Sequence, residues 1–110
     1  FAGAFPVWLS PVQVKVMPIT DRAADYAKSV AARLDAAKVR VETDLRNEKI
    51  GYKIREAQLQ KIPYMLVVGD KEAEAGTVSV RTRAGVDLGA MPLDEFMDKI
   101  GEQIASRSKD

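Results

Sequence analysis

Residues 63–69 read Pro-Tyr-Met-Leu-Val-Val-Gly and are followed by Asp70. All five residues between the proline and the glycine are apolar. Such a run, bounded by turn residues, is typical of a central strand that is covered on both faces. The stretch therefore predicts a sheet with helices packed on both sides.

Two strand–helix units precede this central strand. Apolar residues alternate over residues 12–16 and again within residues 38–44, which predicts two strands. Apolar residues recur every three or four positions over residues 20–37 and 46–62, which predicts two helices. The β-α-β-α-β order indicates parallel neighbours joined by right-handed crossovers.

After the central strand, residues 70–76 are predicted to form a charged loop. Residues 77–83 alternate and predict an antiparallel strand, and a short strand is expected near residues 86–88. A last helix is expected from Pro92, because the apolar residues that follow have the strongest helical spacing in the chain. The predicted fold is α/β with three layers: a mixed, mostly parallel sheet of about five strands and three helices.

Composition narrows the function classes. The 110 residues include no Cys and no His, which excludes disulfides, thiolate nucleophiles, Cys-based zinc sites and a Ser-His-Asp triad. The chain has no GxGxxG or GxxxxGK[ST] motif, and the turn over residues 17–21 has no glycine. A nucleotide-binding enzyme is therefore disfavoured, and so is the alternative of a small-molecule enzyme of flavodoxin-like build, which would need a phosphate loop. No apolar run is long enough to span a membrane. These absences favour a binding module.

Charge is segregated along a nearly neutral chain. The 17 basic and 16 acidic residues give a net charge of +1, so nucleic-acid binding requires a local basic surface. Residues 46–61 carry five basic and two acidic residues, a net charge of +3. A purely structural interpretation is a solvated helix face with Asn47 as its N-cap. Gly51 weakens a helix, which favours close approach of a backbone or a ligand there.

Two further groups have both structural and functional interpretations. Ser79, Arg81 and Arg83 share one face of a predicted strand. Alternating arginines often only keep an edge strand soluble, but a guanidinium held on a strand also suits bidentate contact with guanine. The acidic residues in the segment from Asp70 to Glu74 indicate either a solvated loop or a site for a hard metal ion.

Four segments of the chain stand out together: FPVWLSPVQ at residues 5–13, DLRNEKIGYKIRE at 44–56, IPYMLVVGDKE at 62–72 and VSVRTR at 78–83. They resemble the C-terminal anticodon-binding domain of threonyl-tRNA synthetases, most closely of the bacterial type. The segments occur in the order and spacing of that family, and the resemblance covers essentially the whole chain.

The resemblance implies roles for three residues, and two lysines of the basic segment are added to them as backbone contacts. Arg81 corresponds to the arginine that reads the central anticodon guanine, Glu72 to the glutamate that contacts the third anticodon base, and Asn47 to an asparagine that takes part in the same recognition. Lys49 and Lys61 are expected to contact the tRNA backbone. One departure is that Gln60 precedes Lys61 where the family often has two consecutive basic residues, which weakens the expected phosphate clamp.

The resemblance also implies a domain plan and partners. Residues 1–10 are expected to be the tail of a catalytic domain and a linker, and residues 11–110 the anticodon-binding domain. This chain is expected to have no enzymatic activity and no cofactor of its own. The parent protein is expected to be a cytoplasmic homodimeric threonine–tRNA ligase that uses ATP, Mg and zinc in its catalytic domain. The expected partner is the anticodon loop of threonine tRNA, and no interaction with a membrane is expected. The alternative is an accessory or dimerisation module that does not read RNA.

Overall fold

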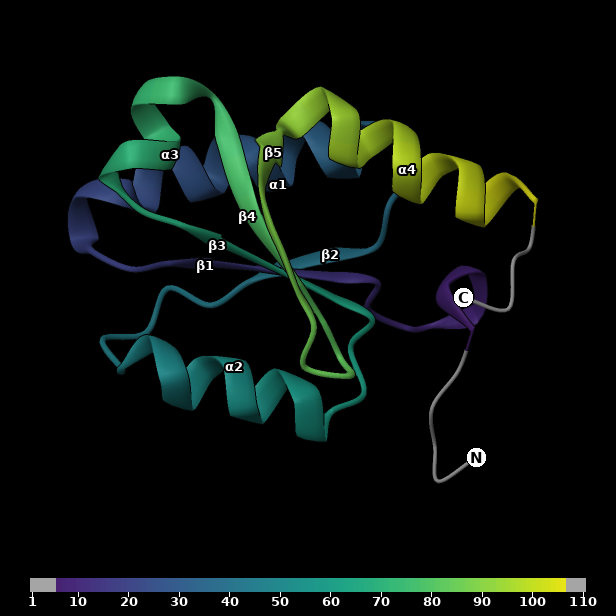
Figure 1. The fold of residues 1–110 in the computed structure, drawn as a ribbon, viewed down its shortest axis with the longest axis horizontal. Helices are drawn as coiled ribbons and strands as arrows, with labels where there is room; N and C mark the ends of the chain where they lie inside the picture. Colours follow the sequence, from purple (N-terminus) through teal and green to yellow (C-terminus); the bar gives the residue numbers. More distant parts are fainter. Residues whose placement is uncertain (1–5, 107–110) are drawn as a thin grey trace.

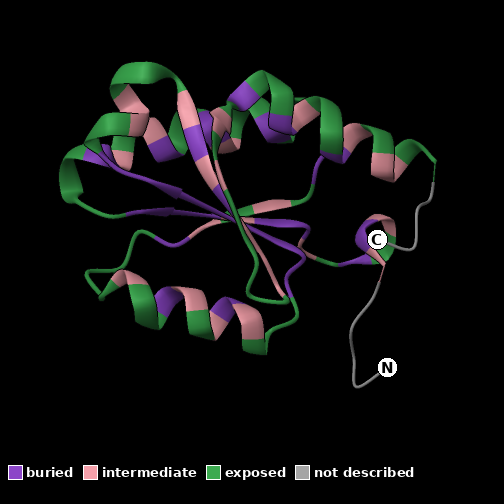
Figure 2. Cartoon of the chain, viewed as in Figure 1, coloured by how far each residue is buried: buried purple, intermediate pink, exposed green. Residues whose placement is uncertain are grey.

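The computed structural model describes residues 6–106. Five strands form one sheet in the order β2-β1-β3-β4-β5. The strands are β1 (Val14–Pro18), β2 (Val41–Thr43), β3 (Tyr64–Val68), β4 (Thr77–Thr82) and β5 (Asp87–Pro92). β3 is central and buried along its whole length, as the apolar run predicts (Figure 2).

The sheet is mixed. β1 pairs in parallel with β2 and with β3, whereas β4 pairs antiparallel with β3 and β5 pairs antiparallel with β4. The five-stranded mixed sheet is confirmed, but its pairings are evenly divided instead of mostly parallel. The reason is that β5 extends to Pro92, beyond the predicted residues 86–88, and forms a full hairpin with β4.

Helices cover both faces of the sheet, which confirms the three layers. α1 and α4 lie on one side and α2 on the other (Figure 1). The larger core lies between the sheet and α1 and α4, and it includes Val16, Leu66 and Phe96. Within residues 6–106 the α-helices are α1 (Ala24–Ala36), α2 (Ile50–Leu59), α3 (Asp70–Ala75) and α4 (Leu93–Ala105), with 3-10 turns at Val7–Leu9 and Asp21–Ala23.

The α2 side of the sheet is only partly covered. Ala57 of α2 packs in a small cluster with Met17 and Met65 of β1 and β3. On the neighbouring strand β4, Val78 and Val80 point into the larger core, so Ser79 and Arg81 lie on the α2 side, where both are half-exposed. We call the α2 side of β4 the open face; it bears Thr77, Ser79 and Arg81.

The helix α3 corrects the prediction of a charged loop at residues 70–76 and raises the number of α-helices in the described part of the chain from three to four. The carboxylate of Glu72 accepts the N–H of Gly69, with Oε1 and N 2.7 Å apart, and closes the first turn. Gly76 ends the helix with a left-handed φ of 70°. Asp70 and Glu72 also lie in the first turn, where negatively charged side chains interact favourably with the helix dipole and stabilise the helix.

The second helix is shorter than predicted. α2 begins at Ile50 with Lys49 as its N-cap, so Asn47 is not the N-cap. It ends at Leu59, because Lys61 adopts a left-handed φ of 63° ahead of Pro63. The segment from residue 44 to residue 49 is therefore a connection between β2 and α2, and Asn47 lies exposed within it.

Part of the predicted tail and linker is described. Residues 1–5 of that segment lie outside the described residues, but Val7 is buried, with 2% of its surface exposed. The side chain of Gln13 donates to the carbonyl of Val7, and Arg40 donates to the carbonyls of Trp8 and Ser10. The domain boundary at residue 10 stays a prediction. Among the helices of residues 6–106, none has the length and apolar character needed to cross a membrane.

Candidate nucleic-acid interface

Arg81 lies on the open face, opposite Met65 of β3. Its side chain is 37% exposed, and its Nη2 is 3.4 Å from Oδ2 of Asp87 on β5. The other carboxylate oxygen of Asp87 accepts the N–H of Gly89 at 2.8 Å. A carboxylate that is itself fixed thus stands beside the guanidinium and limits the directions it can take. This ion pair engages one Nη nitrogen of Arg81, and a guanidinium carries five N–H donors in all.

The position of Asp87 depends on an irregularity in the β4–β5 ladder. Val80 pairs with Gly89 and Arg81 pairs with Asp87, so Leu88 has no partner on β4. Gly89, next to this unpaired residue, has a positive φ of 82°, a conformation that glycine adopts readily at a bulge. Without this shift the residue opposite Arg81 would be Leu88, which carries no charge.

Glu72 caps α3 and still keeps part of its side chain exposed. One carboxylate oxygen closes the first turn of α3, as described above, and the side chain stays half-exposed. It lines a hollow of about 480 Å³ that also includes Thr77 and Ala90. Ala90 pairs with Ser79, so both residues belong to the α2 side of the sheet. The hollow therefore adjoins the open face that carries Arg81.

Asn47 and Lys49 lie on the connection before α2, which is anchored by a buried carboxylate. Only 3% of the Asp44 side chain is exposed. It accepts Nε and Nη2 of Arg46 at 2.8 and 2.7 Å, and the backbone N–H of Arg46 at 3.3 Å. The hydrogen bond from Arg46 lowers the pKa of the Asp44 carboxyl. Arg46 also pairs with Glu56, so one guanidinium ties the connection to α2.

Lys53 holds the same connection from the inside. It is buried, with 3% of its surface exposed, and its Nζ donates to the carbonyl of Asp44 at 3.0 Å. Two of the five basic residues in segment 46–61, Arg46 and Lys53, are thus engaged by the protein itself. The other three, Lys49, Arg55 and Lys61, are exposed and form no ion pair with another residue of the described range 6–106.

Lys49 and Lys61 do not form one clamp. They flank α2 at opposite ends, and a helix of ten residues is about 15 Å long. The carbonyl of Lys61 accepts Nη1 of Arg83 at 3.4 Å, which brings the end of β4 to this end of α2. The predicted contacts therefore form an elongated surface along α2 and the open face, with Asn47 and Lys49 at one end and Lys61 at the other.

The acidic residues after β3 do not gather as a metal site. Asp70 pairs with Arg22 at 2.7 Å and Glu72 caps α3, so both carboxylates have protein partners. In the part of the chain that the structure describes, no three His, Cys, Asp or Glu side chains are grouped as metal ligands.

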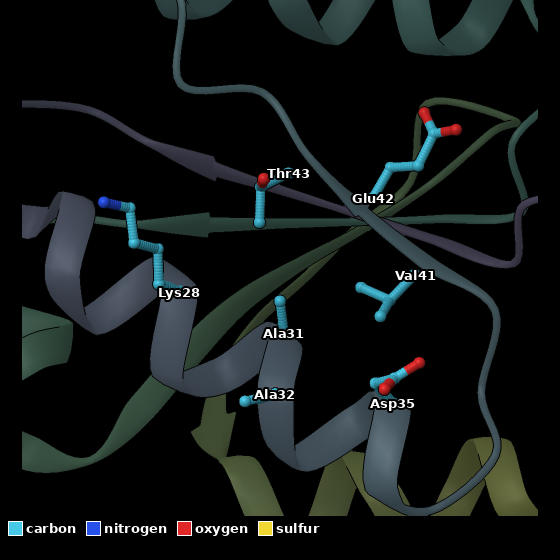
Figure 3. Close-up of a pocket in the computed structure, with 7 residues that line it drawn as sticks. All are labelled: Lys28, Ala31, Ala32, Asp35, Val41, Glu42 and Thr43. Carbon is cyan, nitrogen blue, oxygen red and sulfur yellow. The ribbon is translucent and has the colours of Figure 1, made fainter.

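A second hollow, of about 510 Å³, lies between α1 and the edge strand β2 (Figure 3). Figure 3 shows Val41 and Thr43 toward α1, while Glu42 points to the other face, where it pairs with Lys15 at 3.1 Å. None of the five predicted site residues lines this hollow.

The sequence predicts roles for Arg81, Glu72 and Asn47, which stay predictions, but it does not predict the neighbouring residues Asp87 and Asp44. Asp87 beside Arg81 was not predicted, because the pairing depends on the bulge. Asp44, which anchors the connection before α2, belongs to one of the four matching segments, but no role was predicted for it. Its signal was available: an Asp two residues before an Arg at the end of a strand commonly binds the local backbone.

Comparison with known proteins shows one consistent family. Residues 13–103 match the family described as the anticodon binding domain. The chain is 63% identical over 107 residues to the threonine–tRNA ligase of Syntrophomonas wolfei and 60% identical over 108 residues to that of Caldanaerobacter subterraneus. These matches cover 97% and 98% of this chain but 17% of each relative.

A solved structure agrees in fold and sequence. The crystal structure of the RNA binding domain of threonyl-tRNA synthetase from Cryptosporidium parvum Iowa II superposes with a TM-score of 0.85 at 36% identity. The match covers 91% of this chain and 25% of that one.

Proposed function

The chain belongs to the anticodon binding domain family, and from that premise we propose that it reads the anticodon loop of threonine tRNA as the C-terminal domain of a threonine–tRNA ligase. Its 63% identity to the Syntrophomonas wolfei enzyme supports this assignment. The observation that carries the proposal is the position of Arg81 on the open face beside Asp87.

Arg81 supplies the chemistry that guanine requires. The guanidinium offers parallel N–H donors to the two acceptors O6 and N7 on the major-groove edge of guanine. Adenine has an amino group in place of O6, so the same donors would meet a donor there. The bases of an anticodon loop are unpaired, and their edges are open to a flat surface such as the open face. Arg81 thus prefers guanine at the central position.

The other predicted residues have supporting roles. Glu72 presents carboxylate oxygen, which accepts donors on the third anticodon base, and Asn47 offers both a donor and an acceptor at the exposed connection before α2. Lys49 and Lys61 contact phosphates at the two ends of α2. An elongated set of contacts suits a loop of several nucleotides better than a compact small molecule.

The ligation of threonine to tRNA belongs, in this proposal, to the rest of the parent enzyme. ATP, Mg and zinc act there, through residues outside this chain. The parent enzyme is a cytoplasmic homodimer, in which this domain adds recognition of the anticodon.

The test measures binding of this chain to anticodon stem-loops of threonine tRNA. We expect the stem-loop with guanine at the central position to bind more tightly than the same loop with adenine there, by about 5- to 150-fold. The change of one base keeps the charge and the stem unchanged. Equal binding of the two loops, or no binding of either, would refute anticodon reading and leave the accessory or dimerisation role.

A further inference from the structure

The structure points to a base-stacking platform on α2, and we propose that Tyr52 stacks against an unpaired base of the RNA loop. This proposal rests on the proposed function, because it assigns a further contact to the same partner. Tyr52 lies in the first turn of α2 and is 49% exposed.

The ring is held in a fixed orientation. The guanidinium of Arg46 lies over it, with Cζ 5.8 Å from the ring centroid. The phenolic oxygen of Tyr52 is 3.2 Å from Oε2 of Glu56, to which the hydroxyl donates. Arg46 is in turn fixed by the buried carboxylate of Asp44, with Nη2 and Oδ2 2.7 Å apart. A guanidinium that covers one face of a half-exposed ring leaves the exposed surface mainly on the opposite face and the edges.

The surroundings favour a nucleic-acid base as the occupant. Asn47 follows Arg46 directly, and the carbonyl of Lys49 accepts the backbone N–H of Tyr52 at 3.1 Å. Tyr52 thus lies on the same short segment as one predicted base contact, Asn47, and one predicted phosphate contact, Lys49. Aromatic rings beside cations are the usual stacking platform for unpaired bases, and the cation beneath the ring adds to the attraction.

Gly51 is consistent with close approach at this point. A Cβ added to Gly51 would meet no atom of the described protein within 4 Å, so packing in the chain does not explain the glycine. The glycine lowers helix stability in the turn that carries Tyr52. A base seated on the ring would lie beside this unobstructed backbone.

The experiment replaces loop bases, one at a time, with the fluorescent base 2-aminopurine and measures binding and quenching with the full chain. We expect quenching at one loop position with the unchanged chain. Tyr52→Leu should remove that quenching and weaken binding at least about fivefold. Tyr52→Phe keeps the ring and loses only the hydroxyl, so it should behave like the unchanged chain. Leu59→Ala is the matched control, because Leu59 is 74% exposed at the other end of the same helix.

The outcomes separate this proposal from the proposed function. If the unchanged chain prefers guanine at the central base but Tyr52→Leu binds and quenches as before, the stacking platform is refuted and anticodon reading stands. If the unchanged chain binds no stem-loop, the proposed function fails first. Thermal unfolding of each variant shows whether a loss of binding comes from a loss of folding. If Tyr52→Leu is destabilised, the unchanged chain is compared with Tyr52→Phe instead. Quenching at the same loop position in both supports stacking on the ring, and loss of that quenching in Tyr52→Phe refutes it.

Discussion

Nη2 of Arg81 and Oδ2 of Asp87 lie 3.4 Å apart, on adjacent strands that are brought into this register by a bulge. The distance is longer than the 2.7–2.9 Å of a strong charge-assisted hydrogen bond. Both side chains are partly exposed, at 37% and 51%, so the pair contributes at most about 1 kcal/mol to folding. Its main effect is to direct the guanidinium without saturating its donors.

Asp87→Asn should therefore change specificity more than stability. The asparagine keeps an acceptor for the N–H of Gly89 and loses the charge that directs Arg81. We expect the preference for a central guanine over adenine to fall about two- to tenfold, with unfolding free energy changed by less than about 1 kcal/mol. Binding titrations and denaturant unfolding measure the two quantities. An unchanged preference would mean that Asp87 does not orient Arg81.

Asp44→Asn should destabilise the fold by about 1.5–3 kcal/mol, because it removes charged hydrogen bonds to Arg46 from a buried position. The pKa of Asp44 is lowered below its ordinary value of 3.8 in the folded state. Its contribution is thus fully present above that value and is lost as pH falls through the lower folded pKa. Denaturant unfolding should show a constant difference between the two proteins above about pH 5 that shrinks progressively as the pH falls further. A difference that disappears near pH 5 would contradict the assigned role.

The three exposed cations of segment 46–61 predict a salt dependence. Three phosphate contacts to a single strand give a slope of about −2 in a plot of log binding constant against log salt, or roughly 15- to 20-fold weaker binding between 50 and 200 mM. Lys49→Gln with Lys61→Gln should reduce the slope by about 1.4. Lys99→Gln, on α4 across the sheet, should leave it unchanged. A slope unaffected by the pair of changes would remove both lysines from the interface.

Glu72 has two roles that substitutions separate. Glu72→Gln keeps an oxygen for the N–H of Gly69, whereas Glu72→Ala removes it. We expect the Gln variant to unfold near the melting temperature of the unchanged chain and the Ala variant to lose about 0.5–2 kcal/mol. Both should lose discrimination at the third anticodon base, since neither offers carboxylate. Retained discrimination in the Gln variant would leave Glu72 with only a capping role.

The layers of the fold were predictable because the spacing of apolar residues along the sequence indicates which faces of a strand or helix are buried. The run at residues 64–68 requires cover on both faces, and the alternation at residues 77–83 sorts Val80 inward and Arg81 outward. α3 was missed because six residues are too few to show a helical period. Its existence depends on the contact of Glu72 with Gly69 and on the left-handed backbone of Gly76.

The assignment of site residues stays a prediction, and the groups that contact or surround those residues were not predicted. Motif likeness predicted Asn47, but the connection on which it lies is held by Asp44, which accepts the side-chain and backbone N–H groups of Arg46, and these contacts have no periodic signal. The segment charge of +3 also overstated the free positive surface, because Lys53 is buried against carbonyl groups. Burial and pairing of charges depend on three-dimensional register, which composition does not record.

The central claim is that Arg81 reads a base, and a comparison of Arg81→Ala and Arg83→Ala on loops with guanine or adenine at the central position tests it most directly. Arg81→Ala should weaken binding of the guanine loop by about 1–3 kcal/mol and leave binding of the adenine loop nearly unchanged, which abolishes the preference. Arg81→Lys should recover little, because an ammonium lacks the fork of donors. Arg83→Ala should weaken both loops by the same factor. If Arg81→Ala also weakens both loops equally, Arg81 acts only as a charge and the assignment of base reading is contradicted.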